Sequence, residues 1–454
     1  MRNVKVLCTL GPATDGKVKK LIAMGMNGAR INMSHGTHAE NAARIREVRA
    51  ASKDVFIVVD TLGPKIRLGD FEDRRIRRGE EVVITTASKH ARSADEIPIQ
   101  YNKFHRFIKK GNTILIEDGL IGLAVKKVIG PRIYCRVLYG DLLHKRKGVN
   151  IPYVRFPFPY TTAKDKINIA FALQHKADFI ADSFVRNRAN VRALRRIMGT
   201  SPCKIIAKIE NFEGVKNIDE IINEADGIMI ARGDLGVELP IEEIPKLQKE
   251  IIQKCNQAGK PVITATQMLE SMITNHRPTR AEASDVFNAV VDGSDCVMLS
   301  GETSIGNYPI EAVKVMQTIA DAAEEKVMPA TILENMEDPV SLISKAVSDV
   351  INCKRIKAIV IPTLSGVTAA MIARYRIKKH LYVLTPNETL KRQLSLFWGV
   401  EAFTTKQLNR GDIADASLRV AVQLGLLKPG DIVVVTAGVG HNMQHTNMMQ
   451  LRKI

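Results

Sequence analysis

The chain has 454 residues, of which 45% are hydrophobic and 25% charged, so it is long enough for several domains with a large core. The formal net charge of +18 predicts anionic partners such as nucleotides, sugar phosphates or nucleic acid. No apolar run approaches the roughly 20 residues that span a membrane, and the start of the chain turns polar too soon for a signal peptide. Six scattered cysteines without a CxxC pair favour reduced thiols. We therefore expect a cytoplasmic protein with no membrane partner.

Short apolar runs alternate with helical patterns in two stretches of the chain. Strands are predicted at 4–10, 28–33, 55–60, 179–181, 205–207, 227–231, 262–266 and 296–299. Helices are predicted at 18–24, 38–51, 189–198, 215–223, 241–258, 280–291 and 309–327. Eight strands, each leading into a helix or, once, into an insertion, predict an α/β protein built on a (β/α)8 TIM barrel.

The alternation of predicted strands and helices is interrupted once, and its pattern changes in the last part of the chain. From residue 69 to about residue 155, alternating runs at 81–85, 113–116, 123–128 and 133–137 predict an inserted β-barrel lid domain after the third strand. This insertion holds 18 Lys and Arg against 10 Asp and Glu. After residue 329, strands at 358–361, 381–384 and 432–436, with helices at 341–352, 368–375, 390–397 and 413–423, predict a small doubly wound α/β domain. The predicted boundaries are 1–68 and 157–328 for the barrel, 69–156 for the lid and 329–454 for the C-terminal domain.

Polar residues follow nearly every barrel strand at its carboxyl end, the edge where parallel α/β folds bind ligands. Lys208 and Glu210 end one strand on the same face, and Asp234 follows the next strand. A pair of carboxylates favours a divalent cation, and a lysine beside them favours an anionic substrate. The other candidates are Arg30, Asn32, Asp60, Arg67, Ser183, Arg232, Thr266, Gln267, Ser300 and Glu302.

Eight sequence blocks resemble the pyruvate kinase family. They are ARINMSHG, DTLGPKIR, KGVNIP, AKIEN, ARGDLG, TATQMLESM, PTRAE and MLSGETSIGNYP, in the family's order between residues 29 and 309. The three-part layout is also that of the family. The resemblance implies transfer of a phosphoryl group from phosphoenolpyruvate to ADP, which gives ATP and, after enolpyruvate takes a proton, pyruvate.

The resemblance also implies the role of each site residue. Catalysis would rest on Lys208, Arg30 and Thr266, and the substrate would also meet Gly233 and Asp234. Glu210 and Asp234 would hold Mg²⁺ or Mn²⁺. The nucleotide site would consist of Asn32, Ser34, His35, Arg67 and Lys147. The proton donor to enolpyruvate stays open between Thr266 acting through a water and a relay through Ser300 and Glu302.

One position departs from many potassium-requiring family members. The residues of the family's potassium site are present as Asn32, Ser34, Asp60 and Thr61, but Lys65 stands where those members carry Glu. Two cations about 4 Å apart repel by roughly 4 kcal/mol at an effective dielectric constant of 20. We therefore predict that Lys65 supplies the positive charge and that K⁺ is not required; the alternative is that Lys65 points into solvent.

The C-terminal domain contains TLSGVT, from Thr363 to Thr368, between a strand and a helix. This segment resembles the family's effector-phosphate loop, which predicts a phosphorylated effector, but it lacks the Arg that many members carry where Val367 stands. A simple Ser/Thr helix cap is the alternative. The resemblance implies a homotetramer, and Trp398 is predicted to pack at a domain or subunit contact.

Two other functions fit parts of the pattern. A barrel lyase or aldolase that stabilises a metal-bound enolate would need the same carboxylates, but it would have no use for the nucleotide residues. A nucleic-acid-binding protein would explain the net charge, but aromatic residues make up only 5% of the chain and do not interleave with the basic ones. We predict no nucleic-acid partner.

Overall fold

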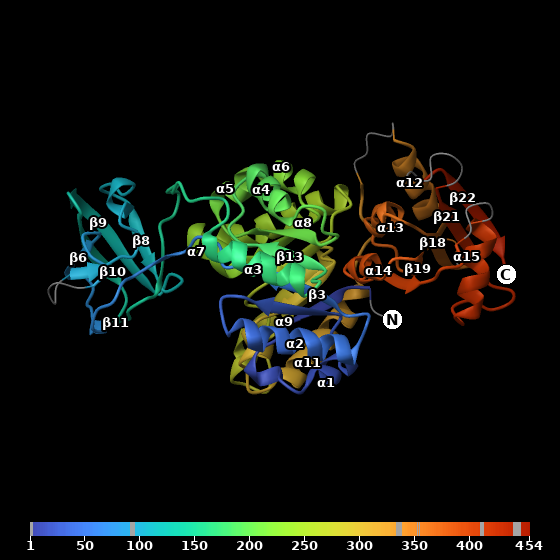
Figure 1. Cartoon of the computed structure of the whole chain (residues 1–454), viewed down its shortest axis with the longest axis horizontal. Coiled ribbons are helices and arrows are strands. Elements are labelled where there is room, and N and C mark those ends of the chain that lie inside the picture. Colours follow the sequence, from blue (N-terminus) through green and yellow to red (C-terminus); the bar gives the residue numbers. More distant parts are fainter. Residues whose placement is uncertain are drawn as a thin grey trace.

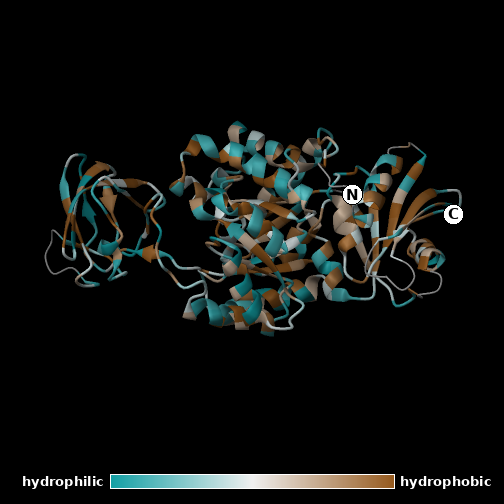
Figure 2. Ribbon diagram, turned by 90° about the horizontal axis from the view of Figure 1, so that it is seen from above, coloured by the Kyte–Doolittle hydropathy of each residue, from teal (hydrophilic) through white to brown (hydrophobic). Residues whose placement is uncertain are grey.

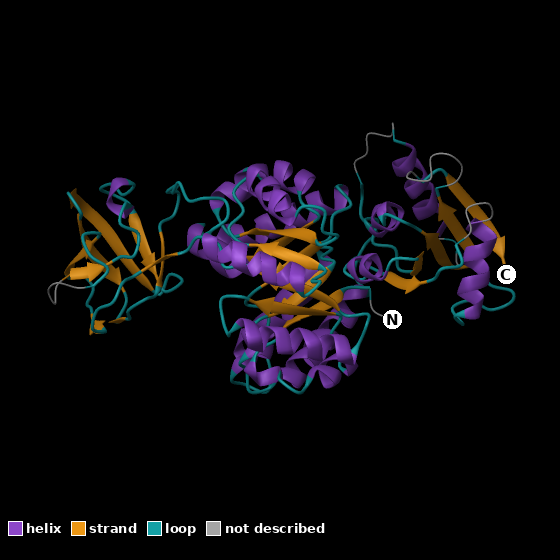
Figure 3. Cartoon of the chain, in the orientation of Figure 1, coloured by secondary structure: helices purple, strands orange, loops and turns teal. Residues whose placement is uncertain are grey.

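The structure is a computed structural model that describes residues 3–90, 96–332, 338–351, 353, 355–408, 413–438 and 446–454. Three units lie in a row, with the inserted domain at the left, the barrel in the centre and the C-terminal unit at the right (Figure 1). The inserted unit combines strands and loops with a short helical turn, whereas the other two units combine strands with many helices (Figure 3). The predicted fold class is confirmed. Within the described part of the chain, no helix has the length and apolar character needed to cross a membrane.

Eight parallel strands close into the central barrel, in the order β1-β17-β16-β15-β14-β13-β3-β2. They are β1 (Lys5–Thr9), β2 (Gly28–Asn32), β3 (Phe56–Asp60), β13 (Phe179–Asp182), β14 (Lys204–Ile209), β15 (Gly227–Ala231), β16 (Val262–Ala265) and β17 (Cys296–Leu299). The bounds agree with the prediction or differ from it by one residue. The exception is β14, which is longer because Lys208 and Ile209 continue the strand.

Helices surround the barrel. They are α1 (Val18–Ala23), α2 (His38–Ala51), α3 (Ala163–Gln174), α4 (Arg188–Met198), α5 (Phe212–Lys216), α6 (Ile218–Glu224), α7 (Arg232–Glu238), α8 (Ile244–Gln257), α9 (Arg280–Val291), α10 (Gly301–Ser304) and α11 (Pro309–Glu324), with short 3-10 turns at Pro12–Thr14, Ile241–Glu243 and Glu270–Ile273. The helix predicted at 215–223 is wrong as a single helix, because it consists of α5 and α6, which meet at Asn217. Helix α3 was not predicted, although Thr162 and Asp165 form a capping box at its start.

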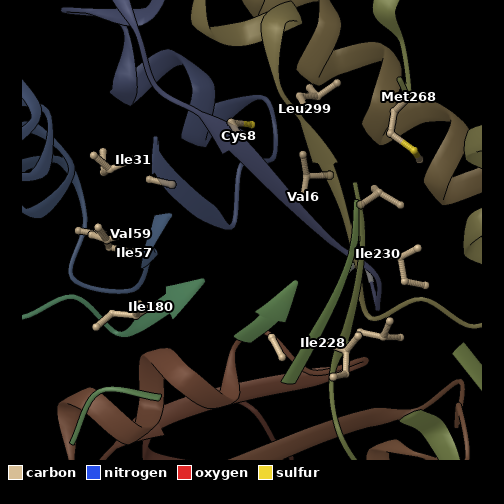
Figure 4. Packing of buried hydrophobic residues seen from close by; sticks show 14 of the residues in the cluster. Val6, Cys8, Ile31, Ile57, Val59, Ile180, Ile228, Ile230, Met268 and Leu299 are labelled. Atoms are coloured by element: carbon tan, nitrogen blue, oxygen red, sulfur yellow. The ribbon is translucent and has the colours of Figure 1, made fainter. Parts of the chain in front are cut away.

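Side chains alternate along the strands between two apolar layers, as the period of a β-strand requires. Phe56 and Val58 on β3 point into the barrel, together with Met229 on β15. Ile57 and Val59 belong to the outer layer, which packs against the helices, and Figure 4 shows them close together. In the hydropathy colouring, brown strands lie inside a shell of helices that carry much of the teal (Figure 2). This packing fixes the strand ends, and therefore the polar residues that follow them.

The inserted unit is a half-barrel sheet in the order β4-β12-β8-β9-β10-β6-β7, with a separate two-stranded sheet of β11 and β5. Its strands are β4 (Ile66–Arg67), β5 (Arg74–Arg75), β6 (Glu81–Thr85), β7 (Glu96–Pro98), β8 (Thr113–Ile116), β9 (Ile121–Ile129), β10 (Arg132–Tyr139), β11 (Leu142–Leu143) and β12 (Gly148–Asn150), with a 3-10 turn at Phe104–Arg106. A β-bridge between Leu68 and Ile99 joins residues next to the two edge strands.

The C-terminal unit has a five-stranded sheet in the order β20-β19-β18-β21-β22. Its elements are α12 (Pro339–Ile351), β18 (Ile356–Pro362), α13 (Val367–Ala373), β19 (His380–Thr385), α14 (Glu388–Leu394), β20 (Val400–Thr404), α15 (Ile413–Gln423), β21 (Ile432–Ala437) and β22 (Met448–Lys453). Strands β20 and β22 were not predicted, and β22 is antiparallel to β21. The predicted end of the first helix at Asn352 lies outside the described residues.

The C-terminal unit covers the amino end of the barrel. Arg376 lies 2.8 Å from the Asp295 carboxylate, and Arg392 lies 2.7 Å from that of Asp178. Leu396 is fully buried and packs with the residues that fill the barrel. The backbone N–H of Trp398 donates to Asp295 at 2.9 Å, so the prediction that Trp398 packs at a domain contact is confirmed.

Candidate active site

A cavity of about 270 Å³ opens at the carboxyl end of the barrel strands. Its walls come from the ends of β2, β3, β13 and β14, from the start of α7 and from the segment that leads into the lid. The residues that line it are Arg30, Asn32, Ser34, His35, Asp60, Thr61, Leu62, Gly63, Lys65, Arg67, Ser183, Phe184, Lys208, Glu210 and Asp234. The sequence predicted most of these polar residues as members of one site.

Lys208 lies at the centre of this group. Its ammonium is 3.0 Å from Asp60 Oδ1, 2.9 Å from Glu210 Oε1 and 2.8 Å from the Ser183 hydroxyl. Burial alone would lower the pKa of Lys208, but the two carboxylates outweigh burial and hold its pKa above the ordinary value. The lysine is therefore charged at any physiological pH.

Asp60 contacts both buried cations of the site. Its Oδ2 accepts from Arg30 Nε at 2.7 Å, while Oδ1 faces Lys208. Burial would raise the pKa of Asp60, but Lys208 and Arg30 outweigh burial and lower it. Arg30 also donates to the Thr9 hydroxyl at 3.0 Å, which fixes its guanidinium. The sequence predicted Asp60 as a residue of this strand edge and as a potassium ligand. Its contact with both cations was missed because that contact depends on strand order.

Glu210 and Asp234 both line the cavity and present carboxylate oxygens, the ligands that divalent cations prefer. Glu210 Oε2 accepts from the Phe184 N–H at 2.7 Å, and burial raises the pKa of Glu210. Asp234 lies in the first turn of α7. The described residues contain no cluster of three or more His, Cys, Asp or Glu side chains suited to a metal. Two carboxylates, completed by substrate and water oxygens, fit Mg²⁺.

Lys65 also belongs to the cavity. Its ammonium is 3.2 Å from Asp234 Oδ1 on the barrel and 3.6 Å from Asp118 Oδ1 on the lid. Burial would lower the pKa of Lys65, but Asp234 and Asp118 outweigh burial and raise it. The alternative that Lys65 points into solvent is therefore wrong.

Thr266 and Gly233 lie beside the cavity but are not among the residues that line it. The Gly233 N–H, predicted to meet the substrate carboxylate, donates to the Thr266 hydroxyl at 2.8 Å. Thr266 and Gln267 have positive φ angles of 67° and 55°, which non-glycine residues adopt at a cost. Arg232 donates to the carbonyl oxygens of both, at 2.8 and 3.3 Å. Arg232 thus holds this backbone, a role that the sequence pattern did not reveal.

The predicted nucleotide residues are divided between barrel and lid. Asn32, Ser34, His35 and Arg67 line the cavity. Lys147 does not; it precedes β12 on the lid and lies 2.5 Å from Glu117 Oε1. A second cavity of about 560 Å³ shares Arg30, Asn32 and His35 with the first and extends the site toward Pro12, Glu40, Arg44 and Ile305.

The two predicted parts of the proton relay have different surroundings. Both carboxylate oxygens of Glu302 accept backbone N–H groups, from Leu269 at 3.0 Å and from Ser300 at 2.7 Å. The buried Ser300 hydroxyl has no hydrogen-bond partner among the described residues. Glu302 therefore holds the loop, while Ser300 belongs to the lining of the second cavity.

The TLSGVT segment forms a tight turn at the start of α13. Gly366 has a φ of 85° and donates its N–H to the Thr363 hydroxyl at 2.9 Å, while the hydroxyls of Thr368 and Thr446 lie 2.6 Å apart. A left-handed backbone at this position favours glycine. The N-cap of α13 is Gly366 and no side chain caps the helix, so the Ser/Thr helix-cap alternative is wrong. The effector remains a prediction.

Comparisons with known proteins agree along the whole chain. Residues 1–313 match the family model described as pyruvate kinase, barrel domain, and residues 341–451 match pyruvate kinase, alpha/beta domain. A pyruvate kinase from Geobacillus stearothermophilus is 44% identical over 474 aligned positions, which cover 100% of this chain and 80% of that protein. One from Clostridium acetobutylicum is 41% identical, with both chains covered completely.

A solved structure of a pyruvate kinase from Cryptosporidium parvum superposes with a TM-score of 0.93 at 36% identity, over 100% of this chain and 96% of the other. The matches extend over barrel and C-terminal unit alike, and the barrel match includes the ends of β14 and β15 with their lysine and carboxylates. The chain therefore belongs to the pyruvate kinase family of glycolytic phosphotransferases, and its reaction is the transfer of the phosphoryl group of phosphoenolpyruvate to ADP.

Proposed function

We propose that Lys208, Arg30 and Thr266 carry this reaction. Lys208 would place its ammonium between the transferring phosphoryl group and the enolate oxygen, because phosphoryl transfer needs charge neutralisation and positioning more than covalent chemistry. Arg30 would hold the phosphate, and Thr266, with Gly233 and Asp234, would hold the substrate carboxylate. The observation that carries the proposal is the buried ammonium of Lys208 within 3.0 Å of two carboxylates at the rim of an open cavity.

A divalent cation, Mg²⁺ or Mn²⁺, would be held by Glu210 and Asp234 and would neutralise phosphate oxygens when bound. Lys208 keeps Glu210 in place, and the Phe184 N–H fixes its second oxygen. For Asp234 to take up this role, its carboxylate must share its charge between the cation and Lys65.

The nucleotide would lie against Asn32, Ser34, His35 and Arg67, with Lys147 brought over it by the lid, which would exclude water on closing. The proposed boundaries are 1–68 and 157–328 for the catalytic barrel, 69–156 for the lid and 329–454 for a C-terminal domain that assembles a homotetramer. A phosphorylated effector would bind to the C-terminal domain at Thr363–Thr368.

The reaction is proposed to run without K⁺. Both oxygens of Asp60 already accept from Arg30, Lys208 and Ser183, and the Thr61 hydroxyl faces the Ala181 carbonyl at 3.2 Å. Lys65 adds a positive charge to the same cavity. A further monovalent cation would have few unused oxygens and would meet three ammonium or guanidinium groups.

The test is pyruvate formation from phosphoenolpyruvate and ADP with Mg²⁺, in potassium-free and potassium-containing buffer. The wild type is expected to turn over equally in both, and Lys65→Glu to become dependent on K⁺. Lys65→Arg, which keeps the charge, is the matched control and is expected to stay independent of K⁺. A wild type that works only with K⁺ would refute the potassium proposal and leave the roles of Lys208 and Arg30 untouched.

A further inference from the structure

The carboxylate of Asp165 holds two parts of the barrel at once. It lies in the first turn of α3, where its Oδ2 accepts the backbone N–H and the hydroxyl of Thr162 as part of a capping box. Its other oxygen, Oδ1, accepts the N–H groups of Leu62 at 3.0 Å and Gly63 at 3.2 Å. The residue is only 4% exposed. One oxygen therefore serves the helix, and the other serves the segment that follows β3 and lines the cavity.

Gly63 lies against the segment that follows β13. Its φ angle is 67°, which favours glycine, and a Cβ atom there would lie 2.7 Å from Phe184 Cδ2 and 3.0 Å from Ser183 Cβ. Phe184 has a φ of 57°, a strained conformation for a non-glycine residue that persists where the surroundings hold it. In this conformation the Phe184 N–H donates to Glu210 Oε2 at 2.7 Å. The strained backbone thus orients a carboxylate that is proposed to hold the divalent cation.

A second set of contacts runs from the same segment to Lys208. The Thr61 hydroxyl accepts the Ser183 N–H at 3.1 Å, and the Ser183 hydroxyl lies 2.8 Å from the Thr61 carbonyl oxygen. The Ser183 hydroxyl also accepts from Lys208 Nζ at 2.8 Å. Strands β3 and β13 are neighbours in the barrel. The segments that follow them therefore interlock, and their hydrogen bonds reach both Lys208 and Glu210.

We propose that Asp165 is a positioning residue for the reaction, because it fixes Leu62 and Gly63 against Phe184 and thereby orients the Glu210 carboxylate. The inference rests on the metal role proposed above for Glu210. Asp165 is not among the residues that line the cavity, so it reaches the cation site through these two segments. A carboxylate is required because donors face both of its oxygens. An amide has one oxygen, which can serve α3 or the segment after β3, but not both.

The alternative is that Asp165 does no more than stabilise the start of α3. Thr162→Ala separates the two roles, because it removes the hydroxyl that caps the helix and leaves Asp165 Oδ1 with Leu62 and Gly63. Both Thr162→Ala and Asp165→Asn should lower the melting temperature, since both weaken the first turn of α3. Only Asp165→Asn should alter the cation site.

The experiment measures binding of Mn²⁺ to the full-length enzyme by electron paramagnetic resonance, without substrate. Outer-shell partners of a metal site usually change its affinity by about 10- to 100-fold. Because Asp165 acts through one further residue, we expect Asp165→Asn to weaken Mn²⁺ binding by about 3- to 10-fold. The Mn²⁺ concentration for half-maximal turnover should rise by a similar factor, and Thr162→Ala should change neither value. Unchanged Mn²⁺ affinity in Asp165→Asn, or an equal loss in Thr162→Ala, would overturn the inference.

A second variant tests the route without touching α3. Gly63→Ala places a methyl group against Phe184 and should also weaken Mn²⁺ binding. If Asp165 acts through Gly63, the double variant should lose less affinity than the product of the two single losses, as residues in one network do. Losses that multiply would show that the two residues act independently and would overturn the proposed route.

Glu210→Gln distinguishes this inference from the proposed function. Its Mn²⁺ affinity should fall further than that of Asp165→Asn, because a ligand itself is changed. An unchanged affinity in Glu210→Gln would refute the metal role proposed for Glu210, and the inference with it. A loss in Glu210→Gln without any loss in Asp165→Asn would overturn the inference alone and leave the proposed function intact.

Discussion

The two ends of the barrel are built from the same kinds of side chain, and they differ in what can reach them. At the amino end, Asp178 and Asp295 precede β13 and β17, and arginines of the C-terminal unit pair with both and cover them. At the carboxyl end, Asp60 and Glu210 pair with Lys208 beside a cavity of about 270 Å³. A buried ion pair joins two parts of a chain when it is covered, and becomes available for chemistry when a ligand can approach it.

The largest expected effect on a variant tests the amino end of the barrel, which the C-terminal unit covers (the covered end). Arg376→Met should lower the free energy of unfolding by about 3–5 kcal/mol, because it leaves the Asp295 carboxylate buried without a cation. Urea unfolding measures this, and Arg75→Met, which breaks an exposed pair with Asp141, is the control with an expected loss below about 1 kcal/mol. Similar losses in both variants would mean that burial of the Arg376–Asp295 pair does not make it more stabilising than an exposed pair.

The next largest effect tests the carboxyl end of the barrel, which faces the cavity (the open end). Lys208→Met should lower kcat by roughly 10²–10³-fold, because the transition state loses its main positive contact. The same variant also leaves Asp60 and Glu210 without their shared cation, so its unfolding should be measured alongside the assay. A variant that folds but keeps most of its kcat would show that Lys208, like Arg376, only neutralises buried carboxylates and does not act in the reaction.

The smallest expected effect concerns the carboxylate of Glu238, which belongs to neither the covered end nor the open end of the barrel. Glu238 ends α7 in the crevice between lid and barrel, no ion pair with it is found among the described residues, and burial raises its pKa from 4.5 to about 7. The raised pKa stabilises the fold below pH 4.5, and this stabilisation is lost as the pH rises toward 7.

Glu238→Gln should therefore gain stability relative to the wild type between pH 5 and pH 8, by up to about 3 kcal/mol. Urea unfolding at both pH values measures the difference, with the exposed neighbour Glu242→Gln as the control. The same pH dependence in both variants would assign the effect to some other group.

The open end could be predicted from the sequence because its residues follow their strands directly. Lys208, Glu210 and Asp234 each stand at the end of an apolar run, and the barrel topology brings such ends together. What could not be predicted are contacts between side chains of distant elements. Asp60 touches Arg30 and Lys208 only because β2, β3, β13 and β14 are neighbours in the closed sheet.

The covered end was not predicted, because nothing in the local pattern indicates which surface of the C-terminal unit meets the barrel. Asp178 and Asp295 look like ordinary loop residues before a strand, and their partners lie about 80 to 215 residues away in the chain. Strand β22 was not predicted for a related reason. Apolar and polar residues alternate poorly in its sequence, MMQLRK, and the segment is a strand because it pairs with β21.

The position of Trp398 gives the protein a natural optical probe. It is the only tryptophan in the chain, it is fully buried, and the Arg376 guanidinium lies 5.6 Å from the centre of its ring. Indole emission depends on the polarity of its surroundings and on nearby charge. Fluorescence excited selectively in tryptophan will therefore report the docking of the C-terminal unit on the barrel, in unlabelled enzyme and in real time, while movements of the distant lid leave the signal unchanged.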